Sequence, residues 1–292
     1  MSRGALYMIC SALGFSVMSV LVKVASEGGL PTGEIVAARA IVTLVVSYWM
    51  VKRADLPLWG NERGKLMFRG LLGFGGLTCY YGSLAHLPLA DATTIQQTVP
   101  VLTSVLAWWI LREHVGWSTA IAIACGLGGV MLIVHPSGAG VEPIGLGFAI
   151  GAVVCSSFAY VTVRQLSRTE NALVIVFYFP LVAMPLSIPW AVVDWVTPSP
   201  TEWLLLVAIG LATQIGQVFL TLGLTLERAG RATSLGYVQV VFAMIWQTVL
   251  FDQPPELASI GGAALIVFGT LAVASAKAAR PSSPDTSTPP RA

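Results

Sequence analysis

Ten apolar stretches divide this chain of 292 residues, and they decide what it can fold into. They run over residues 5–25, 33–51, 67–85, 92–111, 119–134, 144–163, 172–193, 203–224, 232–250 and 258–276. Each is close to the ~20 residues that a helix needs to cross ~30 Å of hydrocarbon. A hydrophobic content of 55%, a mean hydropathy of +0.78 and only 10% charged residues exclude an ordinary soluble protein. We therefore expect an all-α polytopic membrane protein with ten transmembrane helices.

The basic residues outside these stretches, and Arg69 at the start of one of them, all fall on one side when the chain is threaded with its amino terminus inside. That side holds Arg3, Lys52, Arg53, Arg63, Lys65, Arg69, Arg112, Arg164, Arg168, Arg228, Arg231, Lys277, Arg280 and Arg291. The charged residues on the other side are all acidic, namely Glu27, Glu34, Asp91, Glu142, Asp194, Glu202, Asp252 and Glu256. The positive-inside rule makes the basic side cytoplasmic, so both termini are expected in the cytoplasm. A net charge of +2 gives no indication of a nucleic-acid partner.

The sequence also contains a weak internal repeat. A shift of 140 residues places residues 70–131 on 210–271 without a gap, and helix positions and loop lengths coincide. Five helices is an odd number, so the second copy must enter the membrane from the opposite side. The charges agree, because Asp91, expected outside, matches Arg231, expected inside. We predict a 5+5 inverted repeat with units at 3–137 and 142–277, then a disordered cytoplasmic tail at 278–292. Inverted repeats are common in secondary transporters, and a static duplicated bundle is the alternative.

One segment of the first unit carries a recognisable pattern. It reads His86-Leu87-Pro88-Leu89-Ala90-Asp91-Ala92-Thr93, then Thr98-Val99-Pro100-Val101, then Leu111-Arg112-Glu113. It resembles the EamA-type transporters of the drug/metabolite transporter superfamily. The second copy departs from the pattern, because Val240 replaces Pro100 and Gln253 replaces Glu113. The resemblance implies a multi-pass exporter of small metabolites in the bacterial cytoplasmic (inner) membrane. Within the superfamily the chain looks most like the YddG-type exporters of aromatic amino acids.

Polar and aromatic side chains recur along single faces of several predicted helices, at spacings of three, four and seven residues. The substrate-binding residues that we predict from these faces are Ser16, Ser19, Tyr81, Gln97, Pro100, Trp108, Tyr160, Gln214, Gln217 and Tyr237. Pro100 removes a backbone hydrogen bond, which predicts a kink beside the transport path. Glutamines inside a span must face protein or water rather than lipid. The alternative is that these groups only join neighbouring helices.

Two bases, Lys23 and Arg39, lie inside predicted spans, where an unpaired charge is costly. Both are near the outer ends of their helices, so pairing with Glu27 and Glu34 is expected. Contact with a carboxylate of the substrate is the alternative.

Nothing in the sequence indicates an enzyme. There is no nucleophile–base motif, HExxH sequence or glycine-rich phosphate loop, and no Cys/His cluster at metal-ligand spacing. We therefore predict no catalytic residue, no cofactor and no metal. The expected function is a secondary transporter that exports small metabolites, with neutral or aromatic amino acids as substrates, by alternating access. A drug or nucleotide-sugar carrier of the same fold and a channel-like pore are the alternatives. We expect a monomer, with a homodimer as the alternative; proton coupling is left open.

Overall fold

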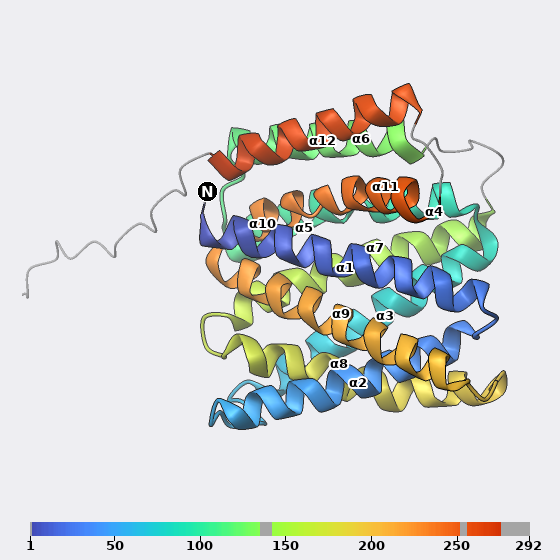
Figure 1. The fold of residues 1–292 in the computed structure, drawn as a ribbon. Coiled ribbons are helices and arrows are strands. Elements are labelled where there is room, and N and C mark those ends of the chain that lie inside the picture. Colours follow the sequence, from blue (N-terminus) through green and yellow to red (C-terminus); the bar gives the residue numbers. More distant parts are fainter. Residues whose placement is uncertain (1, 135–141, 252–255, 276–292) are drawn as a thin grey trace, which may run out of the picture.

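The computed structural model describes residues 2–134, 142–251 and 256–275, which form helices joined by short loops. The helices are α1 (Arg3–Glu27), α2 (Thr32–Arg53), α3 (Arg63–His86), α4 (Leu89–Gln96), α5 (Val99–Leu111), α6 (Trp117–Val134), α7 (Pro143–Leu166), α8 (Ala172–Val193), α9 (Pro200–Leu226), α10 (Ala229–Leu235), α11 (Val238–Phe251) and α12 (Leu257–Ser275). They lie along one common direction in stacked layers (Figure 1). The pair α6 and α12 covers one face of the bundle, and the pair α2 and α8 covers the opposite face.

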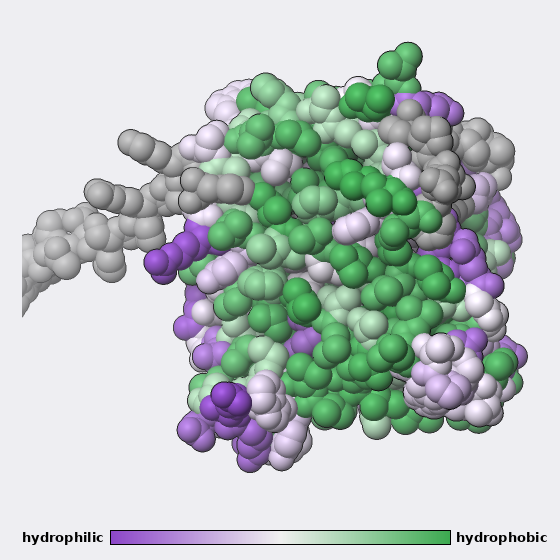
Figure 2. All heavy atoms as spheres, in the orientation of Figure 1, coloured by the Kyte–Doolittle hydropathy of each residue, from purple (hydrophilic) through white to green (hydrophobic). Residues whose placement is uncertain are grey.

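Eight helical segments in the described residues are long and apolar enough to cross a membrane: α1, α2, α6, α7, α8, α9, α10 with α11, and α12. Apolar residues cover most of the middle of the face drawn in Figure 2, and hydrophilic residues gather near its two ends. The chain is therefore an all-helical polytopic membrane protein. The other two predicted spans correspond to α3, which begins with Arg63 and Lys65, and to the divided segment α4–α5. The total of ten and the side of each terminus stay predictions.

Charges divide the bundle into two ends. The starts of α1, α3, α8 and α10 share one end with the ends of α2, α5, α7 and α9. We call it the basic end, because most of the predicted cytoplasmic bases lie there. The other is the acidic end, where Glu27, Glu34, Glu142 and Glu202 lie. The predicted tail at 278–292 is outside the described residues, as are Asp252 and Gln253.

The helices pack in pairs that cross between the two halves of the chain. Helix α1 packs on α9 and α7 packs on α3, while α2 packs on α8 and α6 on α12. Under the 140-residue shift α1 corresponds to α7 and α9 to α3, so the first two pairs are equivalent. Small residues allow the close approach, since a Cβ on Gly14 would lie 2.9 Å from the backbone nitrogen of Gly216. Two repeats related by a two-fold axis would pack in this way; the inverted repeat itself stays a prediction.

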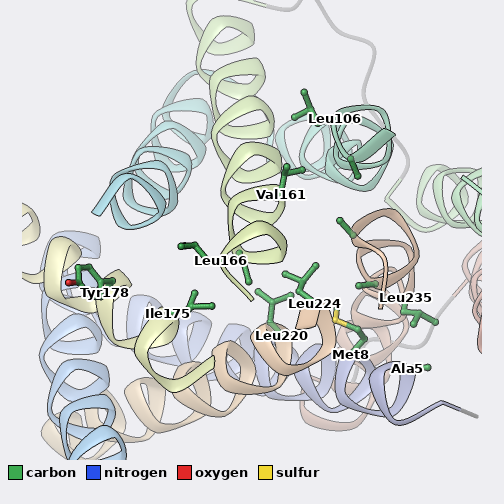
Figure 3. Close-up of a cluster of buried hydrophobic side chains, with 14 of the residues drawn as sticks. Ala5, Met8, Leu106, Val161, Leu166, Ile175, Tyr178, Leu220, Leu224 and Leu235 are labelled. Carbon is green, nitrogen blue, oxygen red and sulfur yellow. The ribbon is translucent and has the colours of Figure 1, made fainter. Parts of the chain in front are cut away.

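The largest buried apolar cluster lies at the basic end. Its labelled side chains in Figure 3 come from α1, α5, α7, α8, α9 and α10, and they are Ala5, Met8, Leu106, Val161, Leu166, Ile175, Tyr178, Leu220, Leu224 and Leu235. The clusters at the acidic end are smaller, for example Leu87, Ala92 and Ala149. The described side chains therefore pack most extensively where the bases gather.

Candidate functional site

Two of the predicted spans are broken in the middle. Helix α4 ends at Gln96 and α5 begins at Val99, while α10 ends at Leu235 and α11 begins at Val238. Under the 140-residue shift the two breaks fall within one residue of each other. The hydroxyl of Tyr237, in the second break, donates to the carbonyl of Gln97, in the first, at 3.0 Å. The two breaks are therefore joined directly, and discontinuous helices of this kind are typical of binding sites in secondary transporters.

The span is interrupted where the sequence predicts a kink at Pro100. Pro100 lies in the first turn of α5 and has no N–H to donate to the Gln96 carbonyl four residues earlier. The break precedes it, at Gln97 and Thr98. The second half breaks within one residue of the matching place without a proline, since the residue that matches Pro100 is Val240. Pro100 is buried, and its carbonyl accepts from the Ser104 hydroxyl at 2.7 Å.

Arg69 lies elsewhere than the distribution of bases in the sequence predicts. The charge pattern assigns it to a cytoplasmic basic segment, but it lies in the second turn of α3 with only 2% of its surface exposed. Its Nη2 donates to Oε1 of Gln217 on α9 at 3.3 Å, and its guanidinium lies 5.0 Å from the ring centroid of Phe179 on α8. Its Nε and Nη1 atoms have no hydrogen-bond partner among the residues that the structure describes. A signal for its burial is available in the sequence, because Arg69 falls inside the apolar stretch 67–85.

Two of the predicted site residues meet Arg69. Gln217 contacts it directly, and Tyr160 on α7 interacts with it electrostatically. Gly73, one turn along α3, makes room for the guanidinium, since a Cβ there would lie 2.9 Å from Nη1 of Arg69. The site therefore draws on α3, α7, α8 and α9, which come from both halves of the chain.

A second buried arginine lies nearer the acidic end. Arg39 on α2 is 8% exposed, its Nη1 lies 3.7 Å from Sδ of Met18, and it interacts electrostatically with Tyr81. The Tyr81 ring meets Trp190 edge-on at 5.7 Å between centroids. These contacts place a cation and two aromatic rings together between α1, α2, α3 and α8.

The two predicted ion pairs of buried bases have different outcomes. Lys23 and Glu27 form the expected pair at 3.9 Å. The pairing of Arg39 with Glu34 is wrong for the described residues, because the Glu34 carboxylate accepts from the backbone nitrogen of Val196 at 3.3 Å. A spacing of five residues puts Glu34 and Arg39 on different faces of α2, whereas a spacing of four puts Lys23 and Glu27 on one face.

Several other predicted residues make contacts between helices. Gln214 exchanges hydrogen bonds with Ser47 of α2 at 2.9 and 3.1 Å. Ser16 accepts from Nε1 of Trp246 on α11 at 3.1 Å. Tyr237 is 1% exposed and packs over Gly126, where a Cβ would lie 2.2 Å from its ring. The structure thus places Gln214, Ser16 and Tyr237 in interhelical contacts.

Ser19 and Trp108 lie apart from the other predicted residues. Ser19 is exposed and donates to the carbonyl of Phe15 in its own helix at 2.9 Å. Trp108 is 61% exposed and lines a mostly apolar groove of about 550 Å³ with residues of α5 and α6, including Val101 and Ala124. Neither contacts the Arg69 site.

The Leu111-Arg112-Glu113 motif has a clear structural role at the basic end. Arg112 ends α5 in a left-handed conformation with a φ of 55°. Oε1 of Glu113 accepts from Nε of Arg164 at 2.8 Å, and its Oε2 accepts from the backbone nitrogen of Ala229 at 2.8 Å. Nη1 of Arg164 also donates to the carbonyls of Leu224 and Thr225. The motif therefore ties α5 to α7, α9 and the start of α10.

A second network closes the same end. Glu227 pairs with Arg231 at 3.2 Å and accepts from the Ser2 hydroxyl, and Nη2 of Arg231 donates to the carbonyl of Val273 at 2.9 Å. In the loop before α3, hydrogen bonds from Lys65 and from Thr169 lower the pKa of the Glu62 carboxyl below its ordinary value. The ion pairs at the basic end thus range from buried, at Glu227, to exposed, at Lys65.

Among the described residues, no group of three His, Cys, Asp or Glu side chains could hold a metal ion. The four cysteines, Cys10, Cys79, Cys125 and Cys155, are free thiols.

Comparison with known proteins identifies the family. The model of the EamA-like transporter family matches the chain twice, over residues 2–135 and 143–275. The chain belongs to the EamA-like transporter family. This EamA-like protein is 31% identical to the pseudopaline exporter CntI of Pseudomonas aeruginosa over 278 residues, 95% of this chain and 98% of the exporter. It is therefore a membrane transporter, and its family and relatives are transporters rather than enzymes.

More distant relatives include a solute carrier and an uptake transporter. Mouse solute carrier family 35 member G1 is 29% identical, covering 91% of this chain and 77% of the carrier. An S-adenosylmethionine uptake transporter of Rickettsia prowazekii is 28% identical, covering 70% of this chain and 69% of the transporter. A crystal structure with 20% identity and a TM-score of 0.82, covering 94% of this chain and 97% of its own, shows the same fold. The relatives do not single out the aromatic amino-acid exporters.

Proposed function

We propose that this EamA-like protein is a secondary transporter that exports small metabolites, with neutral or aromatic amino acids as substrates, across a bacterial cytoplasmic membrane. The observation that carries the proposal is the junction of two helix breaks in one bundle, at Gln97 and Tyr237. Broken helices at a repeat interface free backbone groups for ligand binding, and rocking of one repeat against the other exposes a fixed site to either side. The exporter of Pseudomonas aeruginosa, similar over almost its whole length, supports the direction of transport.

The proposed path passes the aromatic and amide groups between the two halves. Tyr81, Trp190 and Tyr160 offer ring faces, while Gln97 and Gln217 offer amides for the polar groups of an amino acid. Both termini would be cytoplasmic, so that the basic end faces the cytoplasm. In that orientation the networks around Glu113 and Glu227 form the cytoplasmic gate.

Counterflow in proteoliposomes tests the transport proposal. Labelled L-phenylalanine should accumulate transiently in vesicles preloaded with unlabelled L-phenylalanine, with a saturable rate. An empty preload is the control. Flux that never saturates would indicate a channel instead, and absence of exchange across a panel of amino acids would contradict the proposed substrate class.

Cysteine labelling tests the path. Single cysteines at Tyr81, Gln97 and Gln217, in a protein without its four native cysteines, should react with a water-soluble thiol reagent and be protected by L-phenylalanine. Reactivity without protection at all three positions would place the substrate elsewhere.

Reporter fusions test the orientation. A fusion at the carboxyl terminus should report cytoplasm, and one inserted within residues 197–201 should report the exterior. An exterior signal from the first fusion would contradict the topology and the gate assignment together.

A further inference from the structure

We propose that Arg69 binds a carboxylate of the transported substrate, so that the substrate is an anion or a zwitterion held through that group. This inference rests on the transport function proposed above. It adds to that function a residue outside the predicted site and a charge requirement on the ligand.

The first argument is the burial of an unpaired charge. Arg69 is 2% exposed, and Nε and Nη1 of its guanidinium have no hydrogen-bond partner in the part of the chain that the structure describes. A buried cation is unfavourable unless it is paired and hydrogen-bonded. Within the described residues Arg69 donates one hydrogen bond, and the acceptor is the neutral amide of Gln217. The protein alone therefore leaves most of the donors of Arg69 unused.

The second argument is the engagement of nearby acids elsewhere. None of the ion pairs formed within the described residues includes Arg69. At the basic end Glu113 pairs with Arg164 and Glu227 pairs with Arg231. The carboxylate of Glu170 accepts from the backbone nitrogens of Asn61 and Glu62. A counter-ion for Arg69 must therefore come from outside this part of the protein.

The third argument is the shape of the surroundings. Phe179 lies against the guanidinium with its centroid at 5.0 Å, and the absence of a side chain at Gly73 lets the guanidinium and this ring approach α3 closely. A guanidinium held in this way presents a planar fork of donors, which matches the two oxygens of a carboxylate. The amide of Gln217 lies beside it and adds a donor. The charge and geometry fit a carboxylate, and the contributing helices α3, α7 and α9 include both halves of the carrier.

Gln214 and Gln217 provide a matched pair of reporter positions one turn apart on α9. Gln217 contacts Arg69, whereas Gln214 is 4% exposed and hydrogen-bonded to Ser47. Each is replaced by cysteine in full-length protein lacking its native cysteines, reconstituted in proteoliposomes. The probes are two thiol reagents of similar size, the anionic ethylsulfonate and the cationic ethyltrimethylammonium methanethiosulfonates, with rates normalised to those of a small free thiol.

We expect the anionic reagent to modify Gln217→Cys faster than the cationic one. Arg69→Gln should lower this rate ratio on the order of tenfold, the factor that corresponds to about 1.4 kcal/mol. Arg69→Lys, which keeps the charge, should retain most of it. Benzoate should protect the cysteine in the protein that keeps Arg69, while benzamide, its neutral counterpart, should not. Gln214→Cys should react slowly with both reagents.

Other results would overturn the proposal. A rate ratio that Arg69→Gln leaves unchanged, or equal protection by benzoate and benzamide, would make Arg69 a structural cation. So would a Gln217→Cys protein that is inert to both reagents. If Arg69→Gln does not fold, the protection by benzoate in the protein that keeps Arg69 decides. If L-phenylalanine shows counterflow but the two reagents show no rate difference that depends on Arg69, the carboxylate site is refuted and the transport function is not. If that rate difference is present but L-phenylalanine shows no counterflow, the site is supported and the amino-acid substrate class is contradicted.

Discussion

At the basic end the ion pairs between helices are buried or partly buried, whereas at the acidic end the described ion pairs are more exposed. The side chains of Arg164 and Glu113 are 19% and 9% exposed, and those of Arg231 and Glu227 are 9% and 5% exposed. At the acidic end, His86 and Glu142 are 35% and 47% exposed, and Lys23 and Glu27 are 43% and 60% exposed. The comparison covers the described residues, so the loops 135–141 and 252–255 are outside it.

This difference indicates which side of the carrier is closed. Buried pairs hold their geometry because separating them leaves charges without water, while exposed pairs are screened and contribute little. Opening the basic end therefore requires several buried contacts to break together. Under the proposed orientation, the structure is a state that is shut toward the cytoplasm.

The largest expected effect comes from breaking the pair of Glu113 and Arg164. Glu113→Ala should destabilise the protein by about 1.5–3 kcal/mol, because it removes charge-assisted hydrogen bonds from the partly buried Arg164. The matched change at the acidic end, Glu142→Ala, should cost about 1 kcal/mol or less. Denaturant unfolding of the detergent-solubilised protein measures both. Equal losses would mean that the two ends are held with similar strength.

A second pair of substitutions compares the packing of the ends. A Cβ on Gly230 at the basic end would lie 2.4 Å from the Ser104 hydroxyl oxygen and 3.2 Å from its Cα, so Gly230→Ala should cost about 1–3 kcal/mol. Gly147, near the acidic start of α7, has nothing within 4 Å of that position. Gly147→Ala should be neutral or stabilise the helix by up to about 1 kcal/mol. The same unfolding measurement applies, and a destabilised Gly147→Ala protein would contradict the looser packing.

Tyr237→Phe tests whether the hydrogen bond between the two helix breaks couples the basic end to the acidic end. It removes the hydrogen bond to the Gln97 carbonyl and keeps the ring against Gly126. We expect a loss of about 0.5–1.5 kcal/mol in stability. If the junction couples the ends, thiol reactivity of Gln97→Cys should also rise in the variant. An unchanged reactivity would show that the breaks move independently.

The smallest effect is expected in the loop before α3, where the contacts of the basic end are exposed rather than buried. Hydrogen bonds from Lys65 and then from Thr169 lower the pKa of Glu62 in the folded state. A carboxyl with a lowered folded pKa adds stability above its unfolded pKa and loses it as the pH falls through the folded pKa. Thr169→Val should therefore lower the melting temperature slightly at neutral pH, with the difference disappearing in acid. A melting-temperature difference that persists at low pH would contradict the role of Glu62. A large difference at neutral pH would show that even an exposed contact at the basic end contributes strongly to stability.

The helical architecture could be predicted because apolar length and charge placement are local properties. The eight candidate spans correspond to predicted stretches, and the pairing of Lys23 with Glu27 follows from a four-residue spacing. The break at Gly236 and Tyr237 could not be predicted, because no proline or charge marks it and tertiary contacts hold it in place. Pro100 marks the matching break in the first half, because a proline disrupts the helical turn that precedes it.

The candidate site was only partly predictable for a different reason. Helical spacing gives the face on which a residue lies, but it does not say which neighbour that face meets. Gln214 and Gln217 look alike in the sequence, yet one bonds Ser47 and the other bonds Arg69. Arg69 itself is easily missed, because a base near a helix end is ordinarily assigned to the adjacent loop. Which of the remaining residues line the path stays a prediction.

The contact between Tyr237 and Gln97 has a consequence for how the two halves of the chain can evolve. The positions are equivalent under the 140-residue shift, yet one contributes a phenol and the other a main-chain carbonyl. In an assembly of two identical subunits, each with the sequence of one half, both positions would carry the same side chain, and a second phenol would have to fit where Gln97 now lies. Fusion into one polypeptide removes that requirement. Each half can then accumulate its own substitutions at the very place where the two touch.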